Sequence, residues 1–162
     1  MNSVAATAEQ TPRRAMAIFI GGLIAGILDI TSAIVAYRSR GATPMRVFQS
    51  VASGAFGREA AYAGGMKTAL AGFGFHFLIA FTAAAVFYLA SRKLRFLVDH
   101  CVLWGLVYGL CVWTFMNYLV LPLSAIGRST PPITWQALVT GVGGHPFLVG
   151  LPIAWATRRF GR

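Results

Sequence analysis

Four long apolar runs divide the chain, and basic or turn-forming residues bound each of them. They cover residues 15–37, 68–90, 101–121 and 134–157. About 20 residues of helix cross a hydrocarbon core of about 30 Å, and a helix satisfies its own backbone hydrogen bonds in lipid. The pattern therefore predicts an all-α membrane protein, a four-transmembrane-helix antiparallel bundle that forms a single domain over residues 15–162. Residues 1–14 are expected to be a flexible N-terminal tail.

The connection between the first two runs has a helical pattern of its own. Thr43 and Pro44 suit the N-cap and the first position of a helix. The residues after them divide into an apolar side and a polar side: Val47, Phe48, Val51, Ala52, Ala55 and Phe56 against Arg46, Gln49, Ser50 and Ser53. This predicts a short amphipathic helix in the membrane interface or over the mouth of the bundle. Gly64 and Gly65 would form the hinge into the second span.

Composition agrees with a chain whose natural solvent is the bilayer. Hydrophobic residues make up 57% of the chain and charged residues 11%, and the mean hydropathy is +0.67. The net charge of +10 could suggest nucleic acid, but the basic residues stand at the edges of apolar runs, where they mark helix ends. Cys101 and Cys111 match no zinc, redox or haem-attachment spacing, so both are expected to be small buried hydrophobes. The expected partner is the lipid bilayer, with no nucleic acid.

The basic residues also predict an orientation. Eight of them lie on the side that carries both termini, in three compact clusters, and six lie on the other side, mostly in the long connection. Cytoplasmic loops carry the excess of Lys and Arg, so this bias places both termini in the cytoplasm.

Two helices carry glycine pairs at the spacing that lets helices approach closely. Gly22 and Gly26 lie on one face of the first span, and Gly105 and Gly109 on one face of the third. Small residues four apart are typical of contacts between membrane helices, although they do not name the partner helix.

One carboxylate, Asp29, interrupts the apolar first span. A charge at the centre of a bilayer costs about 2.5–3.5 kcal/mol even on insertion scales, so Asp29 should face protein rather than lipid. Three other polar residues lie in the same half of the membrane when depth is reckoned at 1.5 Å per residue: His76, Asn117 and His145. Pro146 should kink the fourth span and free the carbonyl of Val142 in the same region.

Three interpretations of this intramembrane polar cluster stay open. The four side chains could form a network that only fixes helix register. A carboxylate beside an imidazole could instead exchange protons or hold a small solute. His76 and His145 could also hold a b-type haem or a metal, although no cofactor is the simpler expectation. No hydrolase or phosphate-binding motif is present, so an enzyme is not favoured.

With "STPP" followed by "GGH", a glycine-rich first span and a histidine early in the second, the chain resembles the YagU type of bacterial inner-membrane protein. That family has no known biochemical function. The resemblance implies location in a bacterial inner membrane and brings no catalytic residues. The leading hypothesis is a protein that handles or senses protons or a small solute, and the alternative is an accessory subunit that docks onto itself or a larger membrane complex.

Overall fold

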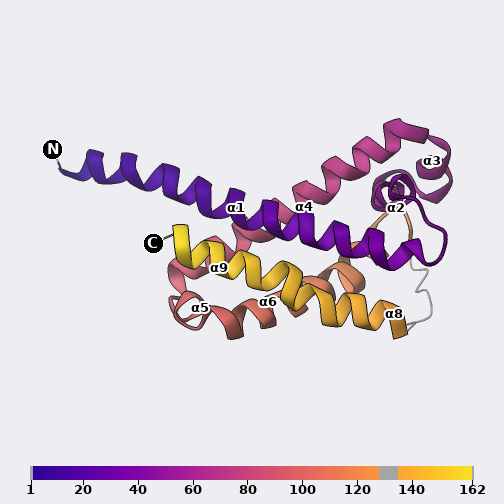
Figure 1. Cartoon of the computed structure of the whole chain (residues 1–162). Coiled ribbons are helices and arrows are strands. Elements are labelled where there is room, and N and C mark those ends of the chain that lie inside the picture. The colour runs from indigo at the N-terminus through magenta and orange to yellow at the C-terminus, as the bar shows by residue number, and fades with distance from the viewer. Residues whose placement is uncertain (1, 128–134, 162) are drawn as a thin grey trace.

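The computed structural model describes residues 2–127 and 135–161, apart from the side chains of residues 2–14, 136, 137 and 140, and its described elements are all helical (Figure 1). The helices that form the body of the molecule are α1 (Asn2–Arg38), α4 (Gly65–Lys93), α6 (Cys101–Phe115) and α9 (Leu151–Phe160). Within the described residues, three helices are long and apolar enough to cross a membrane: Ala15–Arg38, Gly65–Lys93 and Cys101–Leu123. The helix α1 begins at Asn2, well before the start expected at residue 15.

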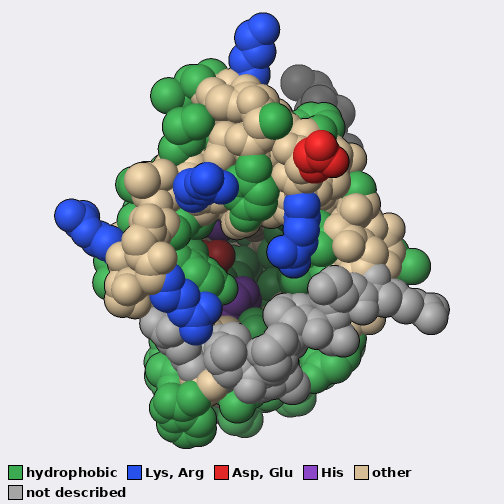
Figure 2. Space-filling model, turned by 90° about the vertical axis from the view of Figure 1, so that its right-hand side faces the viewer, with side chains coloured by type: hydrophobic (Ala, Val, Ile, Leu, Met, Phe, Trp, Pro, Cys, Tyr) green, Lys and Arg blue, Asp and Glu red, His purple; other side chains and the backbone are tan. Residues whose placement is uncertain are grey.

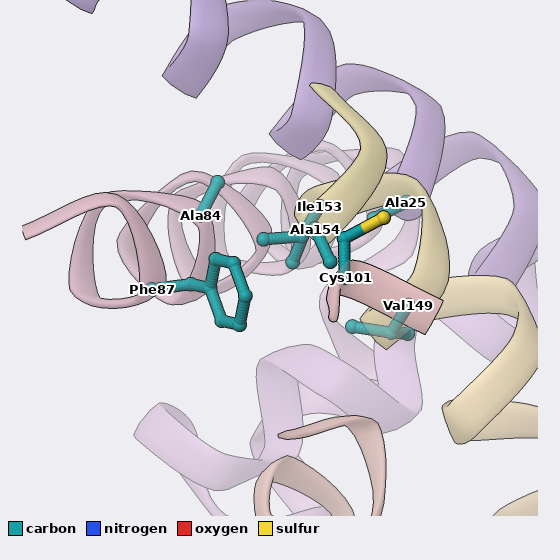
Figure 3. Packing of buried hydrophobic residues seen from close by; sticks show 7 residues of the cluster. All are labelled: Ala25, Ala84, Phe87, Cys101, Val149, Ile153 and Ala154. Atoms are coloured by element: carbon teal, nitrogen blue, oxygen red, sulfur yellow. The ribbon is translucent and has the colours of Figure 1, made fainter. Parts of the chain in front are cut away.

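The long helices lie side by side in the order α4, α1, α9, α6, which differs from their order in the chain. Both termini lie at the end of the molecule that carries α5 (Phe96–Asp99), and α2 lies at the other end (Figure 1). The core is built mainly from small residues, with Phe87 and Ile153 as its largest fully buried side chains. Figure 3 shows this cluster, made of Ala25, Ala84, Phe87, Cys101, Val149, Ile153 and Ala154. Small side chains let the helix backbones approach closely, which compensates for the lack of a hydrophobic drive between helices in lipid.

The connection between α1 and α4 contains two helices, α2 (Pro44–Phe56) and α3 (Arg58–Ala63). Thr43 is the N-cap of α2, as predicted, and its hydroxyl accepts a hydrogen bond from the backbone N–H of Arg46. The turn into α4 passes through Gly65 at a φ of +59°, a conformation that suits glycine. The sequence pattern did not predict α3.

The buried face of α2 differs from the predicted one. Gln49 and Ser53, expected on the polar side, are buried, whereas Phe56 is 48% exposed. The cause is the partner of the helix: α2 packs across α4, and Gln49 donates a hydrogen bond to the carbonyl of Gly65 at 3.0 Å. A buried amide is tolerated when it is hydrogen-bonded. The predicted face is therefore confirmed at Val47 and Ala52, which are buried, and wrong at Gln49, Ser53 and Phe56.

Three π-helical stretches widen the backbone, and each stands before a proline. They are η1 (Met116–Val120), η2 (Val139–Gly143) and η3 (Pro146–Gly150), followed by Pro122, Pro146 and Pro152 respectively. A proline has no N–H to donate, and its ring clashes with the carbonyl four residues earlier, so the preceding turn opens. The expected disturbance at Pro146 therefore takes the form of a π-helical turn. The short helices α7 (Leu121–Leu123) and α8 (Trp135–Leu138) flank these stretches.

The helices α4 and α6 line a groove. Tyr108 bridges them, because its hydroxyl donates to the carbonyl of Ala83 at 2.7 Å and its ring packs edge-on against Phe87. The groove has a volume of about 540 Å³ and is lined by Leu78, Ile79, Thr82, Ala83, Val86, Tyr108, Cys111, Val112, Phe115, Met116 and Val120. Cys111 is exposed here, so the expectation that both cysteines are buried holds for Cys101 and is wrong for Cys111.

Candidate functional site

Asp29 and His145 approach each other within the apolar helices. The distance from Nε2 of His145 to Oδ1 of Asp29 is 3.8 Å. This exceeds the length of a direct hydrogen bond, but two groups this close influence each other's charge strongly where the dielectric constant is low. The side chains keep 26% (Asp29) and 22% (His145) of their surface exposed. The pair is therefore buried enough to be coupled and open enough to meet solvent or a solute.

The backbone around His145 brings its imidazole to α1. His145 lies between η2 and η3, the two widened stretches that Pro146 and Pro152 impose on this part of the chain. On its other side, Gly109 of α6 lies directly against the carbonyl of His145, where a Cβ atom would overlap it. The absence of a side chain at Gly109 thus allows α6 to pack directly against the backbone of His145.

The Nδ1 atom of His145 is buried and makes no hydrogen bond among the described residues. A neutral ring with its proton on Nε2 directs that N–H toward the Asp29 carboxylate. A second proton on Nδ1 would have no acceptor within the described part of the chain.

His76 lies against the same helix but has a different partner. It is 9% exposed, and its Nε2 atom is 2.9 Å from the carbonyl oxygen of Gly26, almost one turn before Asp29. Its ring also packs edge-on against Phe77. His76 therefore links α4 to α1 through the backbone rather than through the carboxylate.

Asn117 uses its amide within its own helix. Its Nδ2 atom donates to the carbonyl of Trp113 at 2.9 Å, one turn earlier. This bond lies beside the widened stretch η1, where backbone carbonyls need donors. Of the four residues expected to form one polar cluster, the structure thus pairs Asp29 with His145, places His76 on the backbone of the same helix, and ties Asn117 to its own helix.

The end of the molecule that carries α2 and α3 is hollowed (Figure 2). Acidic and histidine side chains are visible inside the hollow, and Lys and Arg side chains surround its opening. Asp29 lies in α1 nine residues before Arg38, which stands at this end of the helix, so its depth is about 13 Å at 1.5 Å per residue. Five described basic residues of this end are exposed: Arg38, Arg40, Arg46, Arg58 and Lys67. In the sequence these residues served to predict the orientation, and Arg46 was placed on the polar side of the amphipathic helix. Their concentration in one connection was the signal for a charged opening.

The two glycine pairs lie at contacts within the chain. A Cβ at Gly22 or Gly26 would meet Phe81 or Phe77 of α4. A Cβ at Gly105 would meet Ala154 and the carbonyl of Gly150, and one at Gly109 would meet His145 and Pro146. Both pairs are buried, so they serve the contacts α1–α4 and α6–α9 with its neighbour η3.

No group of three or more His, Cys, Asp and Glu side chains able to hold a metal ion occurs among the described residues. A haem held by His76 and His145 would need both Nε2 atoms. That of His76 is 2.9 Å from the carbonyl of Gly26, and that of His145 faces Asp29. Haem ligation would therefore require both rings to leave their present partners.

Comparison of the chain with protein-family models, with curated proteins and with solved structures gave no match.

Proposed function

We propose that the protein is a membrane protein that exchanges protons, or binds a small solute together with protons, at the Asp29–His145 pair. The observation that carries the proposal is the approach of Nε2 and Oδ1 to 3.8 Å with both side chains partly exposed. A pair that served only to hold helices together would gain most from a direct hydrogen bond away from solvent. A pair without a direct hydrogen bond and with both side chains partly exposed can exchange a proton with solvent.

The proposal includes four membrane crossings. Residues 135–160 run as one helical segment through α8, η2, η3 and α9, which at 1.5 Å per residue is about 39 Å, enough for a hydrocarbon core of about 30 Å. This segment packs on both α1 and α6, which are themselves apolar enough to cross. We infer that it is the fourth helix of an antiparallel bundle.

The excess of basic residues at the end that carries the termini favours a cytoplasmic position for both of them. The resemblance to YagU-type proteins adds a bacterial inner membrane as the proposed location.

The rival function is that of an accessory subunit docked on a larger membrane complex. The glycine pairs were the surfaces expected to serve such docking, but α4, η3 and α9 of the same chain cover them. The rival would therefore need another surface, and the groove between α4 and α6 is the one that remains. The covered glycine faces favour the proton or solute function.

The test is an NMR titration of isotope-labelled histidine rings in the protein held in lipid nanodiscs. The His145 signals should move with pH in the wild type, and their pH dependence should change in Asp29→Asn because the neighbouring carboxylate is lost. The matched control is Asp99→Asn, at the opposite end of the molecule, which should leave the His145 titration unchanged. His145 signals that ignore pH, or that respond identically in wild type and Asp29→Asn, would disprove the proposal.

A further inference from the structure

The opening of the hollow is strongly basic. The described residues at this end include five exposed cations on or next to α1, α2, α3 and α4, namely Arg38, Arg40, Arg46, Arg58 and Lys67, against one exposed carboxylate, Glu59. Two of the guanidinium groups lie over tyrosine rings, Arg40 over Tyr37 and Arg46 over Tyr62, which holds the charge in place without neutralising it. Figure 2 shows Lys and Arg side chains beside the hollow at this end of the molecule. Such an arrangement raises the local concentration of anions.

The basic residues at the opening are positively charged, whereas Asp29, further along α1, is a carboxylate. The Asp29 carboxylate, which lies about 13 Å along α1 from Arg38 at 1.5 Å per residue, is beside His145. An anion drawn in by the opening meets this carboxylate where the dielectric constant is low, and two negative charges at close range repel each other strongly there. The repulsion disappears when a proton is added to the pair, so that Asp29 is neutral or is balanced by a His145 imidazolium.

We propose that the hollow binds a small monovalent anion together with one proton, which the Asp29–His145 pair takes up from water. The sum of one anion and one proton is neutral, so the complex adds no net charge to the membrane interior. This inference rests on the proposed function, because it assigns a ligand class to the same pair.

The other charged groups around Asp29 are few. From α4, His76 faces the backbone of α1 at Gly26, and from α2, Arg46 stands at the opening. The described basic residues of α9, Arg158 and Arg159, lie at the opposite end of the molecule. The proton taken up with the anion is therefore assigned to Asp29 or His145.

The basic opening could attract the phosphate of a lipid headgroup as well as a free anion. The two ligands differ in whether their binding is accompanied by proton uptake. A headgroup held at the opening stays far from Asp29 and causes no proton uptake, whereas a small anion that enters the hollow does.

The experiment is calorimetric titration of acetate into the whole protein in phosphatidylcholine nanodiscs, in two buffers of different ionisation enthalpy. We expect saturable binding with uptake of about one proton per acetate, and stronger binding as the pH falls. In Asp29→Asn, acetate should still bind, but without proton uptake. Arg46→Gln and Lys67→Gln should each weaken binding about threefold, and Arg92→Gln, at the other end of α4, should not.

Several results would overturn the inference: no saturable binding of acetate, binding without proton uptake, or equal loss in Arg92→Gln and Arg46→Gln. A different result would assign the opening to lipid headgroups instead. In that case phosphatidylglycerol would bind saturably, its binding would be the same in wild type and Asp29→Asn, and acetate would not bind. A His145 titration that still depends on Asp29 in the absence of anion would, in each case, leave the proposed proton exchange intact.

Discussion

The Nε2 atom of His76 lies 2.9 Å from the carbonyl oxygen of Gly26, and this hydrogen bond joins α4 to α1 almost one turn from Asp29. The carbonyl is a pure acceptor, so the ring carries a proton on Nε2. Phe77 packs against the same ring, and against Gly26 where a larger residue would not fit. The hydrogen bond and the glycine contact thus fix the position of α4 along the axis of α1. That position in turn determines which side chains surround the Asp29–His145 pair.

Replacing His76 tests this link. His76→Leu keeps the volume but removes the donor to Gly26, and we expect the free energy of unfolding to fall by about 1–2 kcal/mol. Unfolding in mixed detergent micelles, followed by circular dichroism, measures the change. His76→Gln, which retains a donor, should recover part of the loss. An unchanged stability in His76→Leu would show that the bond contributes nothing to the packing of α4 on α1.

Gly72 and Gly74 form a matched pair for the docking of α2 on α4. A Cβ at Gly72 would collide with the carbonyl of Phe48, whereas nothing lies within 4 Å of one at Gly74. Gly72→Ala should destabilise the protein by about 1–3 kcal/mol because the backbone of α2 must move. Gly74→Ala should stabilise it by up to ~1 kcal/mol, since alanine favours helix. Equal effects in the two variants would contradict the close approach of α2.

Gly109 connects packing to the site. A Cβ there would overlap the carbonyl of His145, so Gly109→Ala should push His145 out of position as well as lower the stability. We expect shifted His145 ring signals in NMR spectra and a weaker response to Asp29→Asn. Gly143→Ala is the control, because its added Cβ meets nothing within 4 Å. His145 signals identical in wild type and Gly109→Ala would be inconsistent with the contact.

Tyr108 holds α4 and α6 together across the groove. Tyr108→Phe removes the hydroxyl that donates to Ala83 but keeps the ring on Phe87. The free energy of unfolding should fall by about 0.6–1.5 kcal/mol, the range of hydrogen bonds between membrane helices. Tyr118→Phe, at a ring that is 63% exposed, is the control and should change stability little. An equally large fall in the free energy of unfolding in Tyr118→Phe would show that the hydrogen bond from Tyr108 to Ala83 does not account for the loss.

The sequence by itself determined the features that depend on local chemistry. Apolar length marked the three segments that are able to cross a membrane, because about 20 helical residues match the hydrocarbon core. Thr43 and Pro44 marked the start of α2, because capping involves only neighbouring residues. The cost of a carboxylate in lipid also singled out Asp29 before any partner was known.

Only the tertiary structure decided which partners these residues have. The depth of a residue along its helix can be counted from the sequence, but the rotation of one helix relative to another cannot. This rotation determines that Asp29 faces His145, whereas His76 faces the carbonyl of Gly26. The same reason buried Gln49 against Gly65 and exposed Cys111 in the groove. Asn117 turned to the carbonyl of Trp113, next to a turn that a proline had opened, since a local acceptor needs no other helix. The carboxylate in the apolar run was evident from the sequence, whereas its histidine partner follows from how the helices pack.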